Sequence, residues 1–106
     1  MAEGFVKVAE TRDVSPGEMK LVEVQGQRIV IANMAGSFYA FGDVCTHANG
    51  PLSDGVLEED RVECPWHGSV FDVKSGRPLR PPARSPVPTY RLKVEGDGIL
   101  LALPKD

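Results

Sequence analysis

Short segments in which apolar side chains recur at every second position dominate the chain. This period, in segments rich in β-branched and aromatic residues, predicts β-strands. We expect strands at residues 20–24, 28–32, 37–41, 61–63, 69–73, 90–94 and 99–103. Turn signals with glycine, serine or aspartate separate them, and no stretch offers ten residues of clean helical period. The pattern therefore predicts an all-β fold, an antiparallel β-sandwich or barrel of short strands.

Proline is concentrated near the last third of the chain, at positions 78, 81, 82, 86 and 88. Proline has no backbone N–H to donate to a neighbouring strand, so a central strand does not fit there. We expect this segment to be a stiff extended loop that leads back to the final hairpin.

The length and charge of the chain exclude several classes of protein. Its 106 residues suffice for one domain, which we expect to span 1–106. A net charge of −3 argues against nucleic-acid binding, because such domains are usually basic. No apolar run approaches the roughly 18 residues of a membrane span. The first residues lack the basic and apolar regions of a secretory signal, so we expect a cytoplasmic protein without a membrane partner.

All cysteines and histidines of the chain fall into two short clusters. The first is Cys45-Thr46-His47 and the second is Cys64-Pro65-Trp66-His67. Each cluster follows a predicted strand and lies among loop residues, which can turn side chains toward a shared ion. Two thiols and two imidazoles in this arrangement indicate a metal centre.

Three interpretations of the two clusters remain open on residue types alone. The four side chains could be unrelated, since a free cysteine often acts as a small buried hydrophobic residue. They could hold one structural zinc ion, although zinc fingers usually pair cysteine with cysteine and histidine with histidine along the chain. They could hold a [2Fe–2S] cluster in which two histidines replace two cysteines on one iron, which is the interpretation we favour.

The sequence resembles the Rieske iron–sulfur proteins, and its length and strand pattern are similar to those of the soluble, oxygenase-associated Rieske-type ferredoxins. The residues that carry the resemblance are Cys45-Thr46-His47, Pro51-Leu52-Ser53-Asp54-Gly55, Cys64-Pro65-Trp66-His67-Gly68-Ser69, Phe71-Asp72, Ser75-Gly76 and Pro82-Ala83. The resemblance implies a cluster-binding subdomain formed by two loops, within about 43–84 of the single domain.

The same resemblance implies a ligand set for one Rieske-type [2Fe–2S] cluster per chain. Cys45 and Cys64 would bind the inner iron, and His47 and His67 the outer iron near the surface. Further residues would shape the loops or shield the cluster from water: Thr46, Leu52, Trp66, Gly68, Ser69 and Pro82.

A cluster of this kind passes one electron and has no substrate pocket of its own. An autonomous oxygenase would need a second iron site, commonly two histidines and a carboxylate, and both histidines are already assigned. We therefore expect no catalytic residues.

The resemblance implies a monomeric electron carrier between a flavin-dependent ferredoxin reductase and a terminal oxygenase, often one that acts on aromatic rings. The alternatives are a small Rieske-like subunit of an assimilatory nitrite reductase, or a structural metal domain in a larger assembly.

Overall fold

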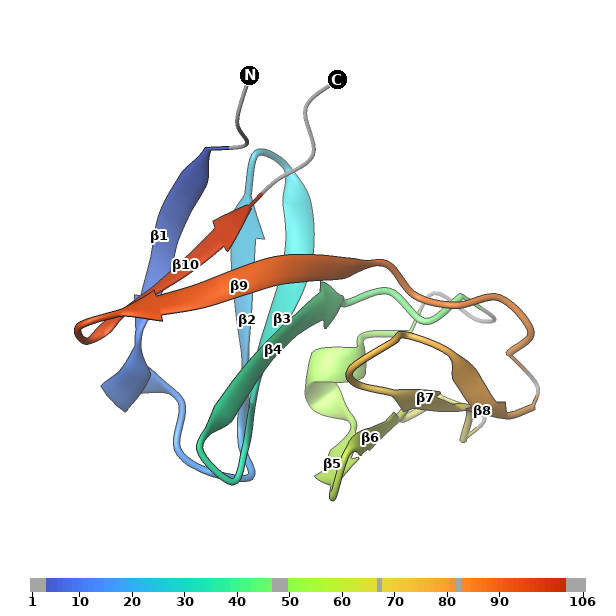
Figure 1. Cartoon of the computed structure of the whole chain (residues 1–106). Helices are drawn as coiled ribbons and strands as arrows, with labels where there is room; N and C mark the ends of the chain where they lie inside the picture. The colour runs from blue at the N-terminus through green and yellow to red at the C-terminus, as the bar shows by residue number, and fades with distance from the viewer. Residues whose placement is uncertain (1–3, 47–49, 67, 82, 103–106) are drawn as a thin grey trace.

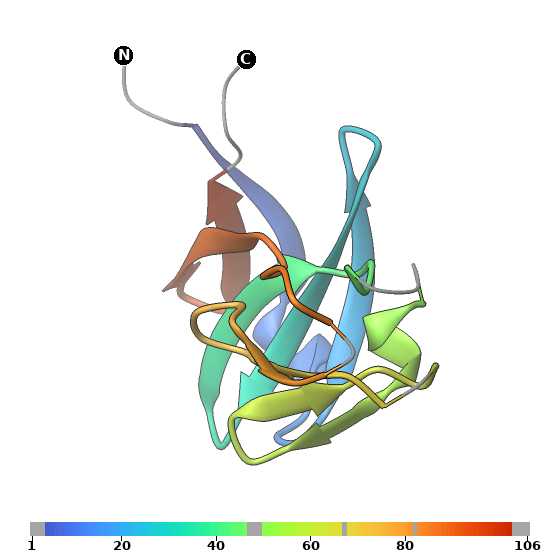
Figure 2. The same ribbon diagram turned by 90° about the vertical axis from the view of Figure 1, so that its right-hand side faces the viewer.

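The fold consists of two antiparallel sheets, joined by the segment that carries Cys45 and by the proline-rich segment. The structure is a computed structural model that describes residues 4–46, 50–66, 68–81 and 83–102. Figure 1 shows the larger sheet on the left and the smaller one at the lower right, and Figure 2 gives the view turned by 90°. In the described part of the chain, no helix is long and apolar enough to cross a bilayer.

The larger sheet has six strands and curls until its two edge strands come into contact. In spatial order its strands are β1 (Phe5–Glu10), β10 (Gly98–Ala102), β9 (Thr89–Glu95), β4 (Ser37–Gly42), β3 (Gln27–Met34) and β2 (Met19–Val24). The all-β, barrel-like fold expected from the sequence is confirmed.

The smaller sheet has four strands of three residues each. Its order is β5 (Val56–Glu58), β6 (Arg61–Glu63), β7 (Val70–Asp72) and β8 (Pro78–Arg80). Two short 3-10 turns complete the described structure, η1 (Thr11–Asp13) and η2 (Leu52–Asp54). The first cysteine loop precedes η2 and β5, and the second lies between β6 and β7, so this sheet forms the body of the cluster-binding subdomain.

All seven expected strands are present, with ends shifted by one or two residues, and three strands were missed. One of these, β8, begins at Pro78 in the segment expected to be a loop. It lies at the edge of its sheet, where a residue without an N–H is tolerated. Of the other two, β5 is largely exposed, and in β1 the exposed and partly buried residues do not alternate regularly.

Strand β3 packs into two separate cores because both of its faces are buried. Ile29 and Ile31 point into a core at the closed side of the large sheet, with Ile99 and Leu101 of β10. The alternate residues, Val30 and Ala32, belong to a second core that also contains both cysteines. Successive side chains of a strand point to opposite faces, so one strand connects the barrel with the subdomain. The second core is completed by Phe41, Leu52, Val62, Phe71, Val73, Ala83 and Val87.

Gly76 joins the smaller sheet to the proline-rich segment. Its N–H donates to the carbonyl of Asp72 at 2.7 Å, and its own carbonyl accepts from the Val87 N–H at 2.9 Å. The backbone of Gly76 has φ +80°, and a Cβ there would lie only 2.2 Å from the Val87 oxygen. Glycine is therefore required for two reasons, backbone conformation and close approach.

Replacing Gly76 with alanine should destabilise the fold far more than the same change at Gly17. Gly17 has a similar φ of +85° but open space around it, so Gly17→Ala should cost only the conformational penalty of about 1 kcal/mol. Gly76→Ala must also move backbone and should cost about 3 kcal/mol or more. Denaturant unfolding followed by far-ultraviolet circular dichroism measures both values, and equal costs would contradict the close approach at Gly76.

Candidate metal centre

The two cysteines begin two loops that are closed in the same way. The N–H of Cys45 donates to the carbonyl of Gly50 at 2.9 Å, and the N–H of Cys64 donates to the carbonyl of Ser69 at 2.7 Å. Each bond spans five residues. A bridge between Val44 and Pro51 precedes the first closure, and the pairing of Glu63 with Val70 precedes the second. Each cysteine thus begins a hairpin-like turn.

The fold brings the two cysteine side chains together in a buried environment. Cys45 is fully buried and Cys64 is 1% exposed, and both belong to the same buried core. Burial raises the pKa of the Cys64 thiol, a hydrogen bond with the Trp66 backbone lowers it, and the neighbouring Cys45 raises it again. Two adjacent thiolates in this core would need a cation to offset their charge, which fits a shared metal site.

Both candidate histidine ligands, His47 and His67, lie outside the described residues, as does Pro82. The remaining residues predicted around the site are placed by the structure. Leu52 is fully buried in the core that holds both cysteines, as expected for a residue that excludes water. Gly68 has φ +75°, which fits a residue that shapes its loop.

The proline-rich segment contacts both loops. Thr46 of the first loop donates its hydroxyl to the carbonyl of Ser85 at 2.7 Å. Ser69 of the second loop is fully buried, and its hydroxyl oxygen accepts from the N–H of Ala83 at 3.1 Å. Since Ser69 accepts that bond, its own hydroxyl hydrogen stays available to a second partner on the loop side. The segment therefore forms a third wall of the site.

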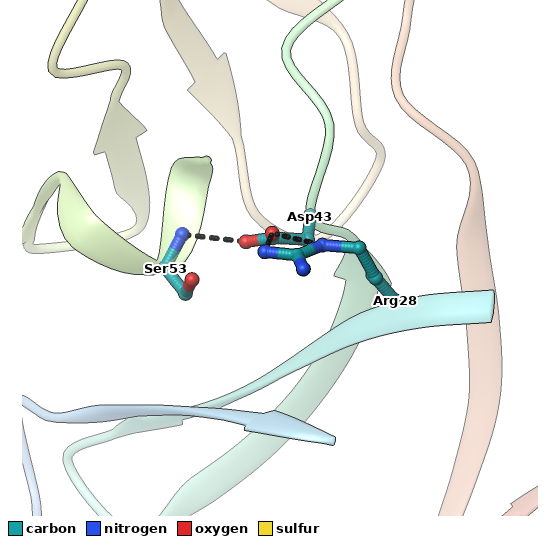
Figure 3. Close-up of polar contacts among 3 residues, drawn as sticks. All are labelled: Arg28, Asp43 and Ser53. Carbon is teal, nitrogen blue, oxygen red and sulfur yellow. Dashed lines mark hydrogen bonds and ion pairs between the residues drawn. The ribbon is translucent and has the colours of Figure 1, made fainter. Parts of the chain in front are cut away.

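Asp43 connects the first loop to the barrel, and sequence reasoning missed this residue. Its side chain is 1% exposed, and one carboxylate oxygen accepts from Nε and Nη2 of Arg28 in β3 at 3.1 and 2.8 Å. The other oxygen accepts from the N–H of Ser53 at 2.8 Å, as Figure 3 shows. No periodicity links Asp43 with Arg28, so only the tertiary structure identifies the pair.

A cavity of about 520 Å³ lies away from the loops. Residues of the β3–β4 turn and the β5–β6 turn line it, together with Pro16, Gly17 and Lys74. None of the described residues of the two loops is among the lining residues. The candidate metal centre is accordingly a loop site in a packed core rather than a pocket.

Comparison with known proteins agrees with this geometry. The family model of the Rieske [2Fe-2S] domain matches residues 4–91, which is most of the chain. The chain belongs to the Rieske [2Fe-2S] domain family, and its cofactor is a Rieske-type [2Fe–2S] cluster.

Relatives of similar length are ferredoxin components of dioxygenases. The ferredoxin component of biphenyl 2,3-dioxygenase from Rhodococcus jostii (strain RHA1) is 40% identical over 99 residues, covering 93% of this chain and 92% of the relative. The ferredoxin of carbazole 1,9a-dioxygenase from Nocardioides aromaticivorans IC177 is 35% identical with a TM-score of 0.89, covering 95% and 98%.

Two further solved structures bear on the alternatives. A complex of reduced oxygenase and oxidized ferredoxin in carbazole 1,9a-dioxygenase contains a chain with 31% identity and a TM-score of 0.89, covering 95% of this chain and 94% of that one. A candidate nitrite reductase (NADPH) small subunit has 23% identity and a TM-score of 0.84, covering 94% and 99%. At 23% identity, the similarity to the nitrite reductase subunit shows only that the two chains share a fold.

In a double-mutant cycle, the effect of Asp43→Asn on the free energy of unfolding should change sign when Arg28 is also replaced. Arg28→Met leaves a carboxylate buried without its counter-charge and should cost about 2 kcal/mol. In the native background Asp43→Asn removes a stabilising partner and should also destabilise. In the Arg28→Met background the same change removes an unpaired charge, so it should be neutral or stabilising. Thermal unfolding of all four proteins measures the coupling.

The exposed pair Lys93–Glu95 is the matched control, with a separation of 3.2 Å and side chains that are 45% and 64% exposed. The cycle of Lys93→Met with Glu95→Gln should give a coupling within about 0.5 kcal/mol. Additive effects at Arg28 and Asp43 would argue against an interaction that depends on the buried charge.

Proposed function

We propose that this chain is a one-electron carrier that delivers electrons from a flavin-dependent reductase to a terminal oxygenase. In this proposal Cys45, His47, Cys64 and His67 are the ligands of its cluster. The observation that carries the proposal is the convergence of two equally closed loops, which brings two buried thiols into one core, with one histidine following each thiol in sequence. The ferredoxin components among its relatives support the same role.

The bound cluster would accept and release a single electron. The protein's part is to set the charge around it. Two thiolates and two neutral imidazoles carry less negative charge than four thiolates, so an added electron is less disfavoured and the potential rises relative to all-cysteine centres. The buried thiols of Cys45 and Cys64 lose their protons on binding, and the surrounding core keeps water from the sulfur atoms. We infer that the chain carries electrons and is not a catalyst by itself.

The surroundings of the two loops suggest which surface meets the partner. Trp66 and Val44 are 50% and 43% exposed, and Arg84 is exposed between the two residues of the proline-rich segment that contact the loops. The acidic run 58–60 lies at the β5–β6 turn, at the opposite end of β6 from Cys64. The partner's face should therefore be partly apolar and carry negative charge.

The complex between an oxygenase and a ferredoxin in the carbazole system supports a terminal oxygenase as the acceptor. The reductase as donor rests on the family resemblance alone. The nitrite reductase subunit remains the second candidate, supported only by shared fold. Anaerobic mixing of the dithionite-reduced protein with the terminal oxygenase of a biphenyl dioxygenase system tests the two. Rapid one-electron reoxidation supports the proposal, and reoxidation by a nitrite reductase large subunit alone would favour the alternative.

Replacing His47 with cysteine should change the spectrum of the reduced protein. A thiolate in place of an imidazole adds negative charge, so the electron paramagnetic resonance signal should shift or vanish and the potential should fall. Thr46→Ala is the control, because it removes the hydrogen bond to Ser85 but no proposed ligand. An unchanged signal in His47→Cys would refute the ligand assignment.

Neutralising Arg84 should slow electron delivery more than neutralising Glu59. Arg84→Gln should reduce the second-order rate roughly threefold at low salt, and the difference should shrink as ionic strength rises. Glu59→Gln changes a charge of the acidic run and should have a smaller effect. Stopped-flow mixing with the oxygenase at several salt concentrations measures both rates. Equal effects would place the docking surface elsewhere.

A further inference from the structure

Gly50 and Trp66 belong to different loops and lie in direct contact. A Cβ built on Gly50 would lie 3.0 Å from both Cγ and Cδ2 of the Trp66 ring. The same Cβ would also lie 3.0 Å from the sulfur of Cys64. Carbon atoms in favourable contact are about 3.5–4.0 Å apart, so no side chain fits between these groups. The backbone of Gly50 is therefore covered by the indole ring.

Each of the two residues belongs to a loop that is closed by a backbone hydrogen bond from a cysteine. The carbonyl of Gly50 accepts from the N–H of Cys45, which fixes Gly50 in the first loop. Trp66 lies inside the second loop, which the bond from the N–H of Cys64 to the carbonyl of Ser69 closes at 2.7 Å. A displacement of the ring from Gly50 would therefore alter the separation of the two sulfur atoms.

The indole ring is held although half of its surface is exposed. An aromatic side chain at the surface usually has freedom to change rotamer. Here one face of the ring packs on the buried backbone of Gly50, near the buried sulfur of Cys64. Water does not reach that face. The rest of the ring faces solvent.

We propose that the contact between Trp66 and Gly50 is a noncovalent clamp that fixes the spacing of the two cluster loops. Trp66 and Gly50 act as positioning residues, and neither is a ligand. This inference rests on the proposed ligand role of Cys45 and Cys64. The clamp requires a ring at position 66 and the absence of a side chain at position 50, and these two requirements depend on each other.

The rate at which the holoprotein loses iron to a chelator under anaerobic conditions tests the clamp. Trp66→Ala removes the ring and should shorten the half-life of the cluster roughly fivefold, because the sulfur of Cys64 gains access to water. Trp66→Phe keeps a ring and should stay within about twofold of the native protein. Leu79→Ala is the control for loss of an equally exposed apolar side chain, since Leu79 is 49% exposed.

Gly50→Ala tests the second requirement through non-additivity. With Trp66 present, the new methyl group meets both the ring and the Cys64 sulfur, and the half-life should fall at least about tenfold. In the Trp66→Ala background the ring is gone, so the same change should cost several-fold less. Equal effects of Gly50→Ala in both backgrounds, or a Trp66→Ala half-life no shorter than that of Leu79→Ala, would overturn the clamp.

A fluorescence measurement separates this inference from the proposed function. Trp66 is the only tryptophan of the chain, so acrylamide quenching of the emission reports on that ring alone. Gly50→Ala should raise the quenching constant, because the new methyl group displaces the ring from its contact with Gly50 and exposes it to the quencher. An unchanged constant would count against the clamp. If the native protein instead lacks the spectrum of a Rieske cluster, the ligand assignment fails while the quenching result still describes the contact.

Discussion

The buried carboxylate of Asp43 is the interaction on which the arrangement of the two sheets depends. It accepts from Arg28 of the barrel on one side and from the amide of Ser53 in η2 on the other. Its backbone adds two further bonds, to the carbonyl of Arg28 at 3.0 Å and from the amide of Leu52 at 2.7 Å. Two residues later the chain reaches Cys45, so the start of the first loop is fixed relative to β3 before the loop turns. A charge buried in this way is tolerated only while all of its partners are in place.

The second constraint is that one strand serves two cores. Ile29 and Ile31 of β3 stabilise the barrel, while Val30 and Ala32 pack in the core of the cysteines. The loops therefore rest on a strand inside the larger sheet rather than on an edge strand. The proline-rich segment returns over the same core through Ala83 and Val87, and its short bonds to Thr46 and Ser69 hold both loops from the other side.

Local patterns in the sequence predicted most of the fold and the identity of the two loops. Strand β9 was found because its alternating period agrees with the turn residues around it, and β3 because it is a run of β-branched residues between two turns. The edge strand β8 was missed because its proline contradicts local propensity and only the pairing with β7 supports it. The cysteines were recognised by their spacing from the histidines. The roles of Asp43 and Gly50 could not be predicted, since each depends on a neighbour that is distant in sequence.

Strand length explains why the barrel, the loops and the cofactor depend on one another. Strands of three residues, as in β5 to β8, are too short to form a stable sheet alone. The smaller sheet gains its stability from the shared core and from the hydrogen bonds of Gly76 and Asp43 to neighbouring segments. The two buried thiols of this core lose their protons when a metal binds, and the metal offsets the charge that this creates. Cofactor binding and the order of the subdomain are thus coupled, because the ligand thiols belong to the core that stabilises the smaller sheet.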